Sequence, residues 1–109
     1  AEVRNVDFYY RRFALDRWFD RERDIICADG TMPSKPHPAI YKKAMERLGV
    51  EPAQCRVYED LATGIASAHA AGAGEIIAVA SAALPEKLEQ LSGVTYAISD
   101  FTDERIREF

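Results

Sequence analysis

At 109 residues the chain is long enough for one domain with a single core and too short for two. Hydrophobic residues make up 48% of it, charged residues 29%, and the formal net charge is -4. This balance gives no support for nucleic-acid binding, which calls for a basic patch. The basic residues are mostly interleaved with acids, as in DRWFDRERD, a pattern typical of a solvated surface. No apolar run approaches the roughly 20 residues of a membrane span, and no signal-peptide pattern opens the chain.

The first half of the chain predicts two helices around one strand. Apolar residues spaced by three and four predict an amphipathic helix from Val3 to about Leu15. The isoleucine-rich run 24–28, DIICA, predicts a short buried strand, and the loop DGTMPSKPHP follows it. The segment AIYKKAMERLGV then has its apolar residues on one helical face, and Gly49 is expected to cap that helix at its C-terminus.

The second half alternates predicted strands with helices. Strands are expected at CRVYE (55–59), IIAVA (76–80) and TYAIS (95–99). A helix of small residues follows the first of them and is expected to lie close against the sheet, ending at Gly72. Pro85 suits the first turn of the next helix, LPEKLEQL, and TDERIREF is expected to form a last helix with Thr102 as its N-cap.

This alternation predicts an α/β fold, a three-layer Rossmann-like core with a mainly parallel sheet, helices on both faces and right-handed crossovers. In such sheets ligands bind outside the carboxyl ends of the strands. Glu59 and Asp60 stand at such an end, directly after CRVYE. Tyr58 precedes them and, by strand alternation, is expected to point away from Glu59 and to serve packing.

The adjacent acids have two interpretations. Two carboxylates above a strand can bind a hard divalent cation, and Mg²⁺ prefers such an oxygen-rich, partly hydrated site. Taken alone, an acidic pair at a strand end is more often a solvated loop or a cap for the following helix. We therefore treat Glu59 and Asp60 as candidate metal ligands whose meaning depends on the residues around them.

Lys35 is the candidate cation for the same crevice, because the stiff loop SKPHP can hold its ammonium there. Beside a Mg²⁺ ion it would neutralise a phosphoryl group, whose transfer relies mostly on positioning and charge stabilisation. The alternative is a surface lysine before a helix. His37 is better interpreted as a solvent-facing residue at a helix start than as a ligand or base, and His69 as a surface residue.

The two cysteines, Cys27 and Cys55, each lie in an apolar segment rather than in a C-x-x-C or Cys/His cluster. We interpret them as reduced, buried thiols, which favours a cytoplasmic protein. A disulfide or a catalytic cysteine is the alternative.

Taken together, these pieces resemble the haloacid dehalogenase-like hydrolase superfamily, in the branch of β-phosphoglucomutase and the small sugar-phosphate phosphatases. The likeness extends from Lys35 to about Val79 and rests on K-P-x-P-x-x-Y, L-G-V-x-P, V-x-E-D-x-x-x-G-I and A-x-x-A-G. The resemblance implies that Lys35 is the catalytic lysine that contacts the phosphate and the nucleophile. It also implies that Glu59 and Asp60 hold Mg²⁺.

The chain departs from the family in one large respect. Family members form an aspartyl-phosphate on an N-terminal D-x-D motif, and no such motif follows an apolar strand here; DGT at Asp29 has Cys27 two positions before it. Residues 1–109 are thus expected to be the C-terminal portion of a core domain, with no nucleophile and no cap. CRVYE would become a sheet edge, which favours a rearranged sheet or a swapped or edge-paired dimer.

Two functions follow as hypotheses. The first is part of a Mg²⁺-dependent phosphatase or phosphomutase for small phosphorylated metabolites such as sugar phosphates, inactive as the isolated chain. The second is a non-enzymatic, degenerate or truncated module that binds metal, phosphate or a partner chain. The substrate itself, and the choice between phosphatase and mutase, depend on residues that the family carries in its cap and near its nucleophile.

Overall fold

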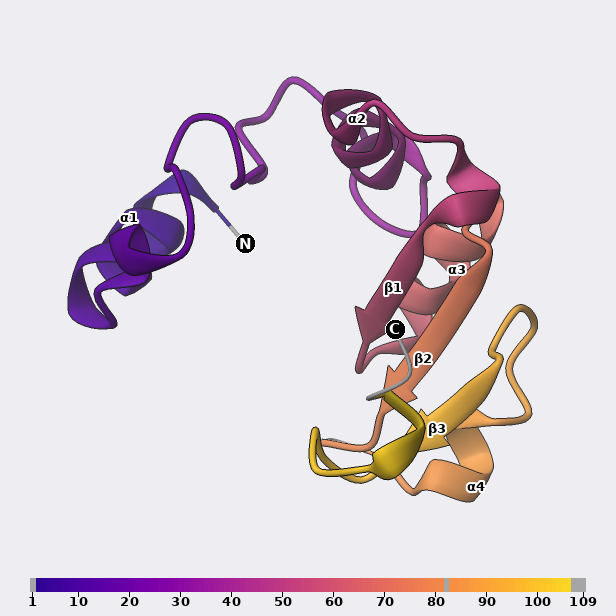
Figure 1. The fold of residues 1–109 in the computed structure, drawn as a ribbon. Coiled ribbons are helices and arrows are strands. Elements are labelled where there is room, and N and C mark those ends of the chain that lie inside the picture. The colour runs from indigo at the N-terminus through magenta and orange to yellow at the C-terminus, as the bar shows by residue number, and fades with distance from the viewer. Residues whose placement is uncertain (1, 82, 107–109) are drawn as a thin grey trace.

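A three-stranded parallel sheet forms the centre of the computed structural model, which describes residues 2–81 and 83–106 (Figure 1). Its strands are β1 (Arg56–Glu59), β2 (Glu75–Val79) and β3 (Tyr96–Ile98), in the spatial order β1-β2-β3. In register, Arg56 lies opposite Glu75, and Ile77 lies opposite Tyr96. The predicted α/β fold with a parallel sheet is confirmed, and β1 is an edge strand.

Two helices cover one face of this sheet. Helix α3 (Ala62–Ala70) connects β1 to β2, and α4 (Pro85–Leu88) connects β2 to β3. Because the strand order follows the sequence, two right-handed crossovers place both helices on the same side. The core there contains Val57, Ile65, Ala68, Ile76, Ala78, Leu88 and Ala97. The close packing predicted for the small-residue helix is confirmed, since the side chains of Ser67 and Ala68 are fully buried against the sheet.

The segment after β3 crosses the opposite face. Phe101 packs on Tyr58 with ring centroids 5.4 Å apart, which confirms the packing role of Tyr58. Arg105 lies over the ring of Tyr96 and donates to the carbonyl of Ala97 at 2.9 Å. These contacts cover a face on which Ile77 and Ile98 are fully buried.

The last two predicted helices are shorter in the structure than expected. Helix α4 begins at Pro85 as predicted but ends at Leu88, after which i→i+3 hydrogen bonds replace the α-helical ones. The predicted start of the final helix, with Thr102 as its N-cap, is wrong, because the 3-10 helix η3 covers only Glu104–Ile106. The Thr102 N–H bonds the Asp100 carboxylate instead, and Asp103 accepts the N–H of Arg105. Residues 107–109 of that prediction lie outside the described residues.

The N-terminal half carries α1 (Val3–Arg12), the 3-10 helix η1 (Leu15–Arg17) and α2 (Ala39–Leu48). Both predicted helices are confirmed. Gly49 ends α2 with φ 71°, a left-handed conformation that costs glycine little. Figure 1 shows α1 at one end of the molecule and the sheet at the other, with α2 beside α3. Helix α1 has no fully buried residue: Val6 and Tyr10 are half-buried, and Val3, Phe8 and Tyr9 are exposed.

The strand predicted at DIICA is wrong. Within the described residues, this segment makes only one isolated parallel bridge, between Ala28 and Glu2. A strand exists only where a neighbouring backbone completes its hydrogen bonds, and among the described residues only Glu2 pairs with this segment. The described residues form no rearranged sheet in which another segment pairs with the free edge of β1, so that alternative is not observed. Pairing of the β1 edge with a second copy stays a prediction.

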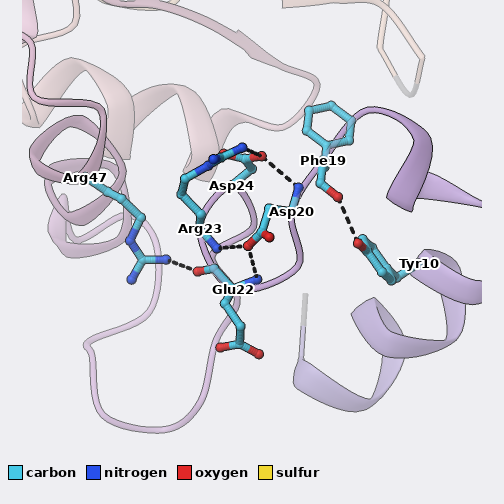
Figure 2. Close-up of polar contacts among 7 residues, drawn as sticks. All are labelled: Tyr10, Phe19, Asp20, Glu22, Arg23, Asp24 and Arg47. Atoms are coloured by element: carbon cyan, nitrogen blue, oxygen red, sulfur yellow. Dashed lines mark hydrogen bonds and ion pairs between the residues drawn. The ribbon is translucent and has the colours of Figure 1, made fainter.

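A charged turn joins the N-terminal helices to α2 (Figure 2). The Asp20 carboxylate accepts the N–H groups of Glu22 and Arg23, and the Asp24 carboxylate accepts the Asp20 N–H at 2.7 Å. Arg47 of α2 donates to the Glu22 carbonyl at 2.8 Å. The segment DRWFDRERD is thus largely exposed, as predicted, and its charges also build a hydrogen-bonded turn. No helix among the described residues has the length and apolar character to cross a membrane.

This turn predicts a measurable acid transition. The hydrogen bond from Arg23, with that from the Asp20 N–H, lowers the pKa of Asp24 from 3.8 to about 2. A lowered carboxyl pKa contributes stability that is present above the ordinary pKa and is lost as the pH falls through the folded value. We expect carboxyl NMR titration to place the Asp24 midpoint near 2 and Arg23→Gln to move it toward 3.8. An unchanged midpoint in that variant would contradict the assignment.

Candidate functional site

The buried carboxylate of Glu59 lies at the carboxyl end of β1, on the face of the sheet that α3 covers. Only 9% of its surface is exposed. Its Oε1 atom accepts a hydrogen bond from Lys35 Nζ at 2.6 Å and another from the Tyr41 hydroxyl. Three separate parts of the chain therefore meet at one oxygen: the end of β1, the loop before α2, and the first turn of α2.

Lys35 is the cationic partner that makes this burial tolerable. A buried charge is costly unless it is paired and hydrogen-bonded. The lysine side chain remains 38% exposed while its ammonium contacts the carboxylate at 2.6 Å, so the pair lies at the edge of the buried region. Lys35 was expected to lie near the acidic pair, and it forms an ion pair with Glu59, which is 24 positions away in the sequence.

Tyr41 completes the cluster around the carboxylate. Lys35 Nζ lies 5.3 Å from the centre of the Tyr41 ring, which adds a cation–π contact to the ion pair. Burial and the hydrogen bond to Glu59 raise the pKa of the Tyr41 hydroxyl far above its ordinary value. The hydroxyl is thus protonated at neutral pH and acts as a donor to Glu59.

Ser67 fixes the lysine loop to α3. Its side chain is fully buried, and its hydroxyl donates to the carbonyl of His37 at 2.7 Å. His37 is exposed, and its Nδ1 atom accepts the N–H of Ala39 at the start of α2. The predicted solvent-facing histidine at a helix start is confirmed. His69 is exposed too, in agreement with its interpretation as a surface residue.

Gly64 leaves the space that the Glu59 carboxylate occupies. A Cβ atom at this position would lie 2.0 Å from Glu59 Oε2, far closer than any real contact. The glycine in the first turn of α3 is therefore required by close approach of a side chain. The carboxylate lies between this helix on one side and the donors Lys35 and Tyr41 on the other.

Asp60 is separated from Glu59 by the alternation of the strand. It is exposed, and its Oδ2 atom accepts a hydrogen bond from the Ser81 hydroxyl at 3.0 Å, just beyond β2. The two adjacent acids thus have different partners: Glu59 has the lysine and the tyrosine, and Asp60 has a serine at the carboxyl edge of the sheet.

The donor set can supply part of a magnesium site. Asp60 offers a hard, exposed carboxylate, of the kind that Mg²⁺ binds together with several waters. Glu59 has one oxygen engaged by two donors and the other against Gly64. Among the described residues there is no group of three or more His, Cys, Asp or Glu that could hold a metal ion by itself. These residues therefore fit a cation that takes only one or two of its oxygen ligands from the described part of the chain.

The cysteines take no part in this cluster. Cys27 and Cys55 are free thiols, as predicted, but both are half-buried rather than buried. Arg21 donates to Cys27 Sγ at 3.6 Å and to Asp7 at 2.8 Å, so Cys27 is bonded toward α1 rather than toward Glu59. The structure gives neither thiol a partner acid or base at the Glu59 site.

Sequence reasoning missed four residues of the site: Tyr41, Gly64, Ser67 and Ser81. The first two stand in the quoted motifs, where Tyr41 was assigned to the apolar face of a helix and Gly64 to close packing. Their contacts with Glu59 could be suspected from the need of a buried carboxylate for donors and space. No signal in the sequence indicates that Ser67 and Ser81 bond to residues 30 and 21 positions away.

The comparisons with known proteins agree on the family. The family model for haloacid dehalogenase-like hydrolases matches residues 2–72. A phosphorylated carbohydrates phosphatase from Thermotoga maritima is 36% identical over 90 residues, which cover 83% of this chain and 33% of that protein. The chain spans a third or less of the length of the curated relatives that it matches.

Two solved structures share the fold. A haloacid dehalogenase hydrolase of family IA, variant 3, from Entamoeba histolytica superposes with a TM-score of 0.89 at 39% identity, over 94% of this chain and 45% of that one. A protein assigned as a β-phosphoglucomutase from Thermotoga maritima gives 0.77 at 28% identity, over 90% of this chain and 44% of that one.

The contact between Gly64 and Glu59 predicts the effect of Gly64→Ala. Helix propensity alone would gain up to about 1 kcal/mol, but the Cβ overpacks the carboxylate, which costs about 1–3 kcal/mol. We expect urea denaturation to show a net loss of about 1 kcal/mol in the free energy of unfolding. In a Glu59→Ala background the same change should be neutral or stabilising. Equal losses in both backgrounds would show that the clash lies elsewhere.

Proposed function

The chain belongs to the haloacid dehalogenase-like hydrolases, and we propose that it supplies the lysine and the acidic pair of a Mg²⁺-dependent phosphoryl-transfer site. The observation that carries the proposal is the ion pair of Lys35 and Glu59 at the carboxyl end of β1, with the exposed carboxylate of Asp60 next in the chain. Carboxyl ends of parallel strands are where α/β sheets bind ligands.

Lys35 has the properties that a phosphoryl group requires. Its ammonium is anchored on Glu59, yet more than a third of the side chain is exposed, so it can approach an anion. Phosphoryl transfer depends mostly on fixed positive charge near the transferring oxygens. We assign Lys35 to binding the phosphoryl oxygens and to stabilising the charge that develops during transfer.

Asp60 and Glu59 are the candidates for holding Mg²⁺. Asp60 is the exposed carboxylate and offers an oxygen that is not bonded to Ser81. Glu59 would contribute its negative charge beside the metal while its Oε1 atom holds Lys35. When bound, the metal would supply positive charge to neutralise the transferring phosphoryl group. Ser81 then orients Asp60 through its hydrogen bond.

Small phosphorylated metabolites such as sugar phosphates are the proposed substrate class. The names of the Thermotoga maritima relatives, a phosphorylated carbohydrates phosphatase and a β-phosphoglucomutase, support this class. The choice between hydrolysis and transfer within the sugar depends on residues beyond those described. We also propose a cytoplasmic location, which the two free cysteines support.

The nucleophilic aspartate is proposed to come from outside residues 1–109. The chain has no D-x-D motif after an apolar strand, and the relatives are at least three times longer than the matched part. The isolated chain is therefore expected to bind but not to turn over a phosphorylated substrate.

A non-enzymatic module is the second candidate. The specific observation in its favour is that Lys35 and Glu59 form their ion pair from the described residues alone, so the cluster needs no nucleophile in order to form. Such a module would bind Mg²⁺, phosphate or a partner chain without catalysis. Titration calorimetry of the isolated chain with Mg²⁺, alone and as Asp60→Asn, measures that binding directly.

The test of the enzymatic proposal restores the missing part from a relative. Residues 1–109 replace the matched 45% of the Entamoeba histolytica hydrolase, and phosphate release from sugar phosphates is measured with Mg²⁺ and with a chelator. We expect Mg²⁺-dependent release from the chimera and none from the isolated chain. Lys35→Ala and Asp60→Asn should each lower kcat by roughly 100-fold or more, the loss typical of one charge-stabilising group.

Matched controls remove the same groups elsewhere on the surface. Lys87→Ala in α4 and Asp16→Asn in η1 change exposed residues outside the cluster and should leave kcat within a factor of about two. A folded chimera without activity, while the chain alone binds Mg²⁺ through Asp60, would favour the non-enzymatic module. Full activity of Lys35→Ala would overturn the role given to the lysine.

A further inference from the structure

We infer that Tyr41 is a positioning residue for Lys35: its hydroxyl orients the Glu59 carboxylate that anchors the lysine ammonium, and its ring supports the same ammonium. The inference rests on the proposed function for what the lysine does, and on the contacts of the described residues for how it is held. Neither the family match nor the relatives' names assign a role to this tyrosine.

The tyrosine and the lysine share one acceptor. The Tyr41 hydroxyl and Lys35 Nζ both donate to Glu59 Oε1, so the position of this oxygen couples the two donors. A lysine ammonium is a compact charge on a flexible four-carbon stem, and its orientation depends on the groups that it meets at its end. Any rotation of the carboxylate would therefore move the ammonium.

The carboxylate cannot be held by Lys35 alone in one orientation. On its other side Oε2 lies against Gly64, which gives close contact but no side-chain donor. Of the two donors to Oε1, the lysine lies at the end of a flexible stem and its side chain is 38% exposed, whereas Tyr41 is half-buried in the first turn of α2 and packs against the core cluster. The rigid donor is thus the tyrosine.

The ring adds a second constraint on the same ammonium. Lys35 Nζ lies 5.3 Å from its centre, within the range of a cation–π contact. The loop before α2 is also attached to α3, because the Ser67 hydroxyl donates to the His37 carbonyl. Tyr41 therefore contacts Lys35 through its ring and Glu59 through its hydroxyl, and the loop that carries Lys35 is held against α3.

Core packing by itself would require only the ring of this residue. Phenylalanine fills the same space, so a tyrosine that served packing alone would tolerate loss of its hydroxyl. The Tyr41 hydroxyl, in contrast, donates to the Glu59 carboxylate. Replacing the tyrosine by phenylalanine would leave this buried carboxylate with one hydrogen-bond donor fewer. Tyr41→Phe therefore separates positioning from packing. Tyr58→Phe is the matched control, because Tyr58 lies on the opposite face of β1, against Phe101.

The first measurement needs no enzymatic activity. In the 109-residue chain labelled with ¹⁵N-lysine, the ammonium of Lys35 is identified by the loss of its signal in Lys35→Ala. We expect its protons in the wild type to exchange slowly with water, about tenfold faster in Tyr41→Phe, and unchanged in Tyr58→Phe. An unchanged Lys35 signal in a folded Tyr41→Phe chain would overturn the inference.

The second measurement uses the chimera described above. We expect Tyr41→Phe to lower kcat/KM about tenfold, and the double variant Tyr41→Phe/Lys35→Ala to be no worse than Lys35→Ala alone. This non-additivity is the signature of a residue that acts through the lysine. Additive losses would overturn the inference, since a tyrosine that only supported the fold would weaken the enzyme with or without Lys35.

Two further outcomes are separated by the design. If Tyr41→Phe fails to fold by circular dichroism, the wild-type hydroxyl proton of Tyr41 is sought by NMR; a slowly exchanging signal supports the bond to Glu59, and its absence overturns it. If every chimera is inactive, the proposed function fails. The ammonium exchange in the isolated chain still decides whether Tyr41 positions Lys35.

Discussion

The Glu59 carboxylate, buried at the end of β1, is the constraint on which the rest of the site depends. A charge with 9% exposure requires donors and a counter-ion, and they come from the loop before α2 and from α2 itself. Its space comes from Gly64 of α3. One ionised group thereby connects the sheet, two helices and a loop. The geometry of Lys35 is a consequence of this connection rather than a property of its own loop.

The alternation of a β-strand explains why two adjacent acids can differ so much. Successive side chains point to opposite faces, and the chain leaves β1 directly after Glu59. Glu59 thus turns toward α3 and the lysine, whereas Asp60 lies exposed beside Ser81. The repulsion expected between neighbouring carboxylates is relieved by separation and by the ammonium. Of the two adjacent acids, the buried Glu59 therefore serves as the counter-ion of Lys35, and the exposed Asp60 offers a carboxylate oxygen to a ligand.

Local patterns predicted most of the fold because local forces decide those elements. Helix α2 with its Gly49 cap, the small-residue helix α3 and the strand at β1 all follow from periodicity and turn residues. The strand predicted at DIICA is wrong for the opposite reason. A strand depends on a neighbouring strand to complete its hydrogen bonds, and the residues of the segment itself do not specify that neighbour. The final helix started later than predicted because Asp103 binds the Arg105 N–H that Thr102 was expected to cap, and Asp100 binds the N–H of Thr102 itself.

The sequence by itself indicated the class of fold and the family and singled out Lys35, Glu59 and Asp60 as candidate site residues, because motifs and periodicity are properties of neighbouring residues. Only the tertiary structure decided how they are grouped: lysine with Glu59 and Tyr41, Asp60 with Ser81. Contacts across 18 to 24 positions depend on how helices pack on the sheet. Packing is set by the whole core at once, so no short stretch of sequence contains it.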